Sequence, residues 1–535
     1  MKKDTFIKGA LASTICIILA KVLGIIYVIP FNRTVGSLGG ALYGYAYNIY
    51  LIFLSLSTVG VPMAISKIVS EYIALGYLDA SKRSYKIASK ITFTFGVIST
   101  LILLIFAPNL AVIIKGDIIG GNSLEDITYV IRVSATAILF TTALSNIRGY
   151  LQGQKYITKQ SISQVIEQFV RVLVIIFGSI IFKKIFGIKE AVGAAIFGAT
   201  LGGIVALIYL LIVHRKELSI KNYDYKPKKE ELKITNKDIL KNIVKYSIPL
   251  VLISVLVSLY TMVDMSLVIK CLVKRLGYSA IDAEYILSCI TTWGAKLNVI
   301  VTSISAGVGV SLLPNISGDY ILKNYDGARN KIYKTLTILL LILIPMVCGL
   351  SVLSTPVWTV FYGYNNLGIS VFKISIFTAL FYAMVNCLII IMQSVNRYKT
   401  VYIGLFTGLI IKILTLIPIM LLFNKLGIHA YYGITISTIL GYLSSILICL
   451  IDLKRTLSIN YTQIIKDVTI GLIASIIMYI VIFLAQKYII TNNTRLISII
   501  SIVIYSIIGI LIYGFIIIKT GVFKRNFKDL LKKDK

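Results

Sequence analysis

Long apolar stretches separated by short polar segments follow one another along the whole chain. Each stretch reaches about 20 residues, the length that an α-helix needs to cross the hydrocarbon core of a bilayer. The stretches are continuous, whereas the strands of a membrane β-barrel alternate apolar and polar residues over about ten positions. The pattern therefore predicts an all-α polytopic membrane protein with about 14 transmembrane helices. We expect them near residues 6–30, 41–64, 89–114, 126–147, 162–182, 190–213, 244–269, 284–313, 335–355, 367–391, 400–423, 429–451, 467–486 and 496–518.

The polar segments carry their basic residues unevenly. If the N-terminus lies in the cytosol, most of the 54 lysine and arginine residues fall on the cytosolic side. This bias is the one that sets the orientation of membrane proteins. The sequence therefore predicts an even number of spans with both the N- and the C-terminus in the cytosol.

A weak internal repeat divides the chain into two halves. The segment after the predicted helix 41–64 resembles the segment after the predicted helix 284–313. Six spans separate the two copies, so they have the same orientation, as in the parallel repeats that relate two transporter halves by a pseudo-twofold axis. The matched residues are Glu71, Tyr72, Ile73, Tyr77, Ala80, Arg83, Tyr85 and Lys86 with Asp319, Tyr320, Ile321, Tyr325, Ala328, Lys331, Tyr333 and Lys334.

The repeat predicts two six-helix lobes and two additional C-terminal helices. The N-lobe is expected over residues 1–213 and the C-lobe over 244–452, with a cytosolic basic linker at 214–243 between them. Residues 453–535 would hold the two additional helices and a basic tail.

The composition excludes a secreted domain, a soluble enzyme and a disordered chain. The chain is 57% hydrophobic and only 14% charged, whereas soluble domains carry about 25% charged residues. We attribute the net charge of +32 to membrane topology and to contact with anionic lipids, and we expect no nucleic-acid partner.

The sequence contains no motif that is typical of an enzyme or of a metal site. The six cysteines lie far apart without a C-x-x-C motif, and there are only two histidines, so neither a disulfide framework nor a metal site is expected. No phosphate-binding G-x-x-x-x-G-K-[S/T] motif is present either. We therefore expect a protein that is not an enzyme and that has no cofactor.

Several ionisable residues lie inside the predicted helices. A charge in the membrane is costly and usually faces a cavity or a partner. Basic residues outnumber acidic ones among them, which favours an anionic substrate over a cationic drug. The candidates for the cavity are Lys21, Arg171, Lys296 and Lys412, and the candidates for a supporting ion pair are Glu167 and Asp264.

Other interpretations stay open for some of these residues. Glu167 and Arg171 are four positions apart and could neutralise each other instead of contacting substrate. Asp264 could pair with a lysine or bind a cation. Lys21 and Lys296 lie deep in their predicted helices, and we expect both to face one hydrated cavity.

Glycine and proline interrupt three of the predicted helices and are candidates for hinges. The alternative is ordinary packing of small residues, which is common in membranes. The candidate hinge residues are Gly24, Pro30, Pro62 and Pro314.

Several motifs resemble a known group of transporters. The segments 21–24, 36–45 and 61–67 are similar to the opening of the polysaccharide-transporter branch of the multidrug/oligosaccharidyl-lipid/polysaccharide (MOP) exporter superfamily. The most specific block is 148–153 followed by 163–172, which contains Gln164 and Gln168. It resembles MurJ-type lipid II flippases and the stage V sporulation protein B group, and 312–317 continues this similarity.

The resemblance implies two lobes around a central cavity, a lipid-tail groove formed by the last two helices, and alternating access without ATP hydrolysis. Its cavity arginines are matched by Lys21 and, within one position, by Lys296; Gln164 and Gln168 would support the cavity. A second basic residue of some relatives is replaced here by Tyr27. The sodium site of others needs a carboxylate where this chain has Lys412, which argues against sodium coupling.

The resemblance also implies the substrate and the location. The substrate would be lipid II, an undecaprenyl-pyrophosphate-linked glycolipid moved from the inner to the outer leaflet of a bacterial plasma membrane, with cell-wall synthesis proteins as further partners. The candidates for the energy source are a sodium gradient, a proton gradient and the membrane potential. The alternatives are another undecaprenyl-linked polysaccharide of capsule, teichuronic or spore-cortex type, a drug or cation exporter, and a non-transporting scaffold.

Overall fold

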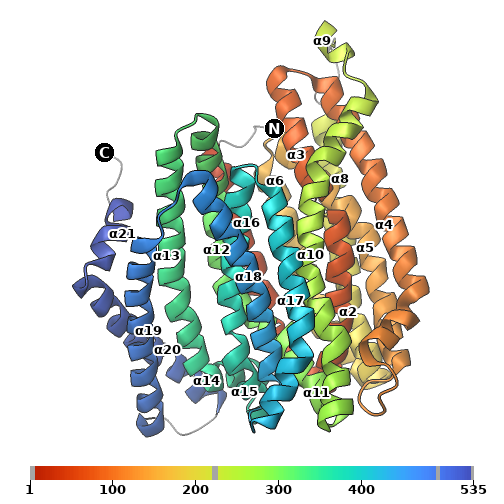
Figure 1. The fold of residues 1–535 in the computed structure, drawn as a ribbon. Coiled ribbons are helices and arrows are strands. Elements are labelled where there is room, and N and C mark those ends of the chain that lie inside the picture. The colour runs from red at the N-terminus through yellow and green to blue at the C-terminus, as the bar shows by residue number, and fades with distance from the viewer. Residues whose placement is uncertain (1–5, 59, 220–226, 490–493, 532–535) are drawn as a thin grey trace. The chain divides into compact units, whose positions relative to one another are not determined.

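The computed structural model describes residues 6–58, 60–219, 227–489 and 494–531, and within these ranges every regular element is a helix (Figure 1). Twelve segments of this part are long and apolar enough to cross a membrane. The predicted all-α, multi-pass architecture is confirmed. The number of 14 spans stays a prediction.

The helices group into two compact units. The first comprises Met1–Lys270 and Ser279–Tyr285, and the second comprises Cys271–Tyr278 and Ile286–Lys535. The helix that follows the linker covers residues 236–276, and it belongs to the first unit as far as Lys270. The predicted boundaries at 214–243 and 453 rest on the sequence repeat and stay predictions.

The first unit is built from long helices joined by short turns. Within it α1 packs against α6, and α5 contacts α2, α3, α4 and α8. The elements are α1 (Phe6–Ile26), α2 (Val28–Thr58), α3 (Gly60–Leu75), α4 (Leu78–Lys115), α5 (Leu124–Gly153), α6 (Ile157–Leu173), the π-helix η1 (Val174–Gly178), α7 (Ser179–Ile185), α8 (Ile188–Ser219), α9 (Lys229–Leu232) and most of α10 (Asn236–Leu276).

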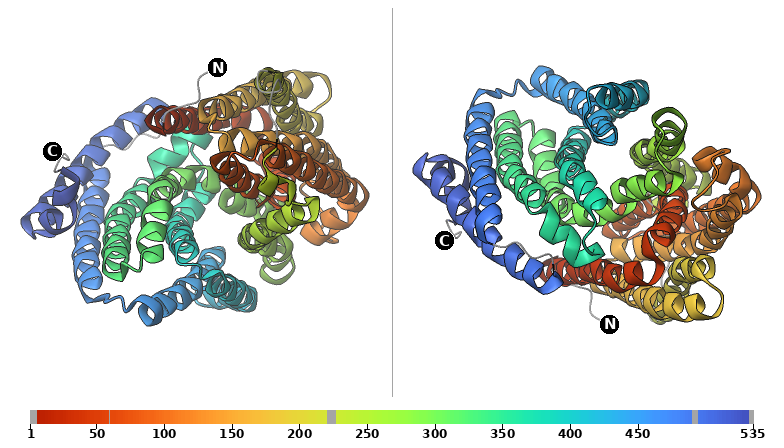
Figure 2. Two further views of the ribbon diagram at one scale, coloured as in Figure 1. Left: turned by 90° about the horizontal axis from the view of Figure 1, so that it is seen from above. Right: turned by 90° about the horizontal axis from the view of Figure 1, so that it is seen from below.

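The second unit follows through α11 (Ala280–Ser288), whose first residues group with the first unit. Its C-terminal helices α19 to α21 lie along one side, next to α13 (Figure 2). The remaining elements are the π-helix η2 (Cys289–Trp293), α12 (Gly294–Ile321), α13 (Tyr325–Val352), α14 (Ser354–Tyr362), α15 (Asn366–Ser375), α16 (Phe377–Ser394), α17 (Tyr398–Lys425), α18 (Tyr432–Leu457), α19 (Thr462–Ile489), α20 (Arg495–Lys519) and α21 (Val522–Leu531).

The first predicted helix, 6–30, is interrupted in the structure. α1 ends at Ile26 and α2 begins at Val28, because Pro30 has no N–H to continue the hydrogen-bond ladder. A second break lies inside α2, where Gly36 has a φ of 69°. Glycine adopts this backbone conformation without steric cost.

The other candidate hinges lie within helices. Gly24 is in α1, Pro62 is the third residue of α3, and Pro314 is in α12, where its side chain lies outside the described part. Pro62 is buried against α5, since a Cβ at Gly149 would lie 2.4 Å from its carbonyl oxygen. Hinge motion at all four positions stays a prediction.

The end of the basic linker packs on the turn between α3 and α4. Glu231 is fully buried and accepts a hydrogen bond from the backbone N–H of Ala80 at 2.8 Å. The hydroxyl of Tyr77 donates to Glu230 at 2.9 Å, and this hydrogen bond raises the pKa of Tyr77. The carboxylates of α9 thus stabilise the N-terminus of α4, where the helix dipole favours negative charge.

Candidate functional site

A polar stripe runs along one side of α6. Gln164, Glu167, Gln168 and Arg171 are spaced three and four positions apart, which places them on one face of a helix. α8 approaches this part of α6 closely, because a Cβ at Gly202 would lie 2.6 Å from the carbonyl oxygen of Glu167. The absence of a side chain at Gly202 therefore lets α8 pack against the backbone of α6 beside Glu167 and Arg171.

A second arginine reaches this stripe from α5. Arg148 precedes Gly149, and the missing side chain at Gly149 lets α3 approach α5. The Nε of Arg148 donates to the hydroxyl of Ser163 in α6 at 2.8 Å. Contact between α5 and α6 thus brings Arg148 beside the α6 residues.

Glu167 bridges the two arginines. Its Oε2 lies 2.9 Å from Nη1 of Arg148, and its Oε1 lies 2.7 Å from Nη2 of Arg171. The exposed fractions of the three side chains are only 16%, 13% and 10% for Arg148, Arg171 and Glu167. The predicted pair of Glu167 with Arg171 is therefore present, but it is part of a triad.

The triad leaves hydrogen-bonding capacity unused. Nη2 of Arg148 and Nε of Arg171 are buried without a hydrogen-bond partner among the residues that the structure describes. Such donors are costly unless a ligand or water satisfies them. The unused groups are N–H donors only, so they fit an acceptor such as a phosphate oxygen.

These residues line a cavity of about 290 Å³ within the first unit. Two cations and one anion face it, so its charge is positive. The complete lining is Ala20, Tyr50, Leu51, Leu54, Thr58, Thr141, Ser145, Arg148, Gln164, Glu167, Gln168 and Arg171.

Four of the predicted site residues, Gln164, Glu167, Gln168 and Arg171, meet in this cavity. The others lie elsewhere. Lys21 is half-buried in α1, next to the lining residue Ala20, and Lys296 is half-buried in α12 of the second unit. The chamber that these two lysines are expected to share stays a prediction.

Lys412, Asp264 and Tyr27 are buried, and none of them belongs to the lining of this cavity. Lys412 in α17 is fully buried, and Asp264 in α10 is 5% exposed. Tyr27, at the break between α1 and α2, lies with its hydroxyl 3.3 Å from that of Tyr43. The substrate contact predicted for Lys412 and the ion pair or cation site predicted for Asp264 stay predictions.

Arg148 is the site residue that the sequence pattern missed. The predicted helix ended at residue 147 because Arg148, Gly149 and Tyr150 interrupt the apolar run, whereas α5 continues to Gly153. The block 148–153 did stand out as a family motif. The ion pair between Arg148 and Glu167 could not be predicted from spacing, because the two residues lie on different helices.

An apolar groove lies within the second unit, between α13, α19 and α20. It measures about 500 Å³, and its walls include Leu341, Met346, Met478, Gly509 and Gly514. Phe523 of α21 also lines it. The groove lies at the last two long helices, where the resemblance implies a groove for a lipid tail.

The long apolar helices define a multi-pass membrane protein, and its helical fold is shared with a lipid II flippase and a multidrug transporter of known structure. The chain belongs to the polysaccharide biosynthesis protein family, whose model matches residues 6–317. It is 29% identical over 487 residues to the lipid II flippase MurJ of Bacillus subtilis (strain 168), covering 90% of this chain and 88% of that protein. It is also 30% identical to stage V sporulation protein B of the same organism, over 41% of each chain.

Solved structures share the fold at low sequence identity. A lipid II flippase MurJ in an inward closed conformation matches with a TM-score of 0.66 and 16% identity, over 98% of this chain and 100% of that one. An inward-facing multidrug resistance MATE family transporter matches with a TM-score of 0.61 and 14% identity, over 83% and 98%. The two matches show that this chain shares their helical fold.

Proposed function

We propose that this protein is a flippase for lipid II, moving the undecaprenyl-pyrophosphate-linked headgroup from the inner to the outer leaflet by alternating access. The observation that carries the proposal is the buried triad of Arg148, Glu167 and Arg171, with its excess positive charge and unused donors. A diphosphate supplies the negative charge and the acceptor oxygens that such a site requires.

The low polarity of the surroundings strengthens this match. A charge pair in a poorly solvated cavity interacts several times more strongly than in water. The cavity of about 290 Å³ is at the lower limit for small-molecule sites, so it has room for a diphosphate but not for a whole glycopeptide. The sugar and the peptide would therefore remain outside this cavity.

In this proposal the apolar groove binds the prenyl tail of the substrate. A prenyl chain gains about 25 cal/mol for each Å² of apolar surface that it removes from water, and the groove offers an apolar wall for part of the chain. The chain could stay in the groove or in lipid while the headgroup crosses. The energy source in this proposal is an ion gradient or the membrane potential, without a cofactor.

A flippase for another undecaprenyl-linked polysaccharide is the second candidate, favoured by the similarity to stage V sporulation protein B. Both candidate substrates contain a diphosphate, so the triad serves either one. A cationic drug is disfavoured because the cavity has more arginines than carboxylates.

Depletion of this protein from its host is expected to trap lipid II in the inner leaflet. Radiolabelled lipid II in whole cells would become at least about tenfold less accessible to an external lipid II-cleaving enzyme. Re-expression should restore access within one doubling time. If lipid II accessibility is unchanged while a different lipid-linked glycan accumulates, the second candidate is correct.

Replacement of Lys21 or Lys296 by alanine is expected to reduce transport about tenfold while the protein still inserts. Each removes a half-buried positive charge from a membrane helix, and with it attraction for a diphosphate. The measurement is growth complementation in a flippase-depleted strain, with protein level checked by immunoblot. Lys90→Ala, an exposed position on α4, is the control, and full complementation by both cavity variants would remove these lysines from the site.

A further inference from the structure

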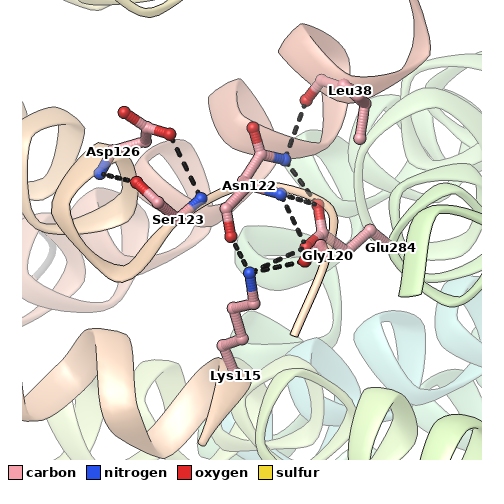
Figure 3. Close-up of polar contacts among 7 residues, drawn as sticks. All are labelled: Leu38, Lys115, Gly120, Asn122, Ser123, Asp126 and Glu284. Atoms are coloured by element: carbon pink, nitrogen blue, oxygen red, sulfur yellow. Dashed lines mark hydrogen bonds and ion pairs between the residues drawn. The ribbon is translucent and has the colours of Figure 1, made fainter. Parts of the chain in front are cut away.

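A buried polar cluster surrounds the turn between α4 and α5 (Figure 3). Lys115 is the last residue of α4, and its side chain is 5% exposed. Glu284 of α11 faces it with a side chain that is 1% exposed. The proposed transport of a diphosphate does not use these charges, so they require another explanation.

The donors of the turn converge on one carboxylate. The backbone N–H of Asn122 donates to Oε1 of Glu284 at 3.0 Å, and the side-chain amide of Asn122 donates to Oε2. Nζ of Lys115 lies 4.0 Å from Oε1. The amide of Asn122 also donates to the carbonyl of Leu38 in α2 at 3.1 Å.

The turn forms this carboxylate seat largely by itself. Nζ of Lys115 donates to the carbonyl of Gly120 at 2.7 Å and to that of Asn122. Gly120 and Gly121 have φ values of 92° and 66°, which glycine adopts without steric cost. A Cβ at Gly121 would lie 2.4 Å from Oε1 of Glu284, so glycine also makes the space that the carboxylate occupies.

The helix that follows the seat is anchored independently of Glu284. Ser123 and Asp126 form a capping box at the start of α5, with the N–H of Asp126 donating to the Ser123 hydroxyl at 3.0 Å. The segment from Lys115 to Asp126 therefore keeps its internal hydrogen bonds whether or not Glu284 is bound.

Glu284 comes from a short segment with its own capping interaction. Ser279–Tyr285 groups with the first unit, although the residues on both sides of it group with the second. The hydroxyl of Ser279 accepts from the N–H of Asp282 at 3.1 Å, which caps α11. Along the chain, α11 continues through the π-helix η2 into α12, the helix that carries Lys296.

The polar character of this contact suits repeated opening. Desolvation offsets much of the attraction in a buried ion pair, so such a pair contributes little net stability. When the two sides separate, water solvates the carboxylate and the donors. Removing one partner alone is costly because it leaves the other charge buried and unpaired.

We propose that Lys115, Asn122 and Glu284 form a reversible latch, and that Glu284 must leave its seat in every transport cycle. In the closed latch the seat holds the segment Ser279–Tyr285. In the open latch α11 is free to shift, and its movement passes along the continuous chain to η2 and α12. The latch serves transport of any lipid-linked glycan, so it does not depend on the identity of the substrate.

A reversible cross-link tests the latch directly. Asn122→Cys and Glu284→Cys are combined, joined with a short bifunctional methanethiosulfonate, and reconstituted into lipid vesicles. We expect cross-linking to reduce flipping at least tenfold and dithiothreitol to restore it. Unchanged flipping by the cross-linked protein would show a static contact and overturn the proposal, as would failure of the two thiols to cross-link.

The controls separate the latch from general rigidity and from chemical damage. Thr136→Cys with Thr200→Cys joins α5 to α8, whose hydroxyls lie 2.7 Å apart within the same unit, and its cross-link should leave flipping unchanged. The protein with only its six native cysteines, each a free thiol, receives the same reagent. Each single cysteine variant does so as well.

A second measurement does not require a cross-link. In purified protein carrying Asn122→Cys, the thiol at position 122 reacts with a polar methanethiosulfonate only when Glu284 is displaced. Adding Glu284→Gln removes the negative charge and should raise the reaction rate several-fold. An unchanged rate would mean that the carboxylate does not hold the seat closed, which contradicts the latch whatever the transported lipid.

Discussion

Arg171→Ala is expected to reduce transport by about 100-fold or more while the protein still folds and inserts. The guanidinium is one of two cations in the cavity, and its loss leaves Arg148 neutralised by Glu167. Truncating one partner of a buried, hydrogen-bonded charge pair costs about 2–5 kcal/mol. Arg148→Ala should have a similar effect. Flipping of lipid II by reconstituted protein is the measurement.

The variant Glu167→Gln separates anion binding from simple structural support. It removes the negative charge and leaves both arginines, so inorganic diphosphate should bind more tightly than to the unaltered protein. Arg171→Ala should bind it more weakly, as measured by calorimetry in detergent. A purely structural triad would lose thermal stability in both variants without opposite changes in affinity, which would contradict the proposed site. Arg132→Ala, at an exposed position of α5, is the matched control and should change neither property.

Filling the apolar groove is expected to impair transport according to the length of the lipid tail. Gly514 lines the groove, and in the described part of the chain no atom beyond its neighbours and the nearby backbone of its own helix lies within 4 Å of a Cβ placed there. Gly514→Phe should therefore occupy space that a prenyl chain would use, with little disturbance of the helix packing. We expect flipping of undecaprenyl-linked substrate to fall at least tenfold, because apolar contact is lost.

The same variant should transport a short-chain analogue of lipid II almost normally. A tail of two or three isoprene units does not depend on the groove, so its flipping should fall less than about twofold. Gly318→Phe is the control, because a Cβ there also meets none of the described atoms within 4 Å outside its own stretch of helix, and Gly318 does not line the groove. Equal losses for long and short tails would mean that the groove does not hold the tail.

The helical architecture could be predicted because it depends on local patterns. In a bilayer every backbone polar group must be satisfied within the segment, so a long apolar stretch forms a helix. Apolar patterning does not locate helix ends, however. α4 begins at Leu78 and α5 ends at Gly153, well into polar sequence that hydropathy assigns to loops. The break at Gly36 was also not expected, because one glycine among several looks the same in the sequence.

The candidate site was predicted only in part, for a related reason. The spacing of Glu167 and Arg171 identifies an ion pair on one helix, and the structure contains it. Arg148 joins the pair because α5 contacts α6, where Nε of Arg148 donates to the hydroxyl of Ser163. Whether two residues on different helices meet depends on how the helices pack, which a periodicity along one helix does not contain.

The sequence by itself determined that this chain is a helical membrane protein with costly buried charges, because hydrophobic length and charge are properties of single segments. Only the tertiary structure decided which charges meet. It joined Arg148 to Glu167 and Arg171, and it placed Glu284 in a seat made by Lys115 and Asn122. The physical reason is that electrostatic and hydrogen-bond energies act over a few ångströms in space, at distances that the packing of separate helices sets.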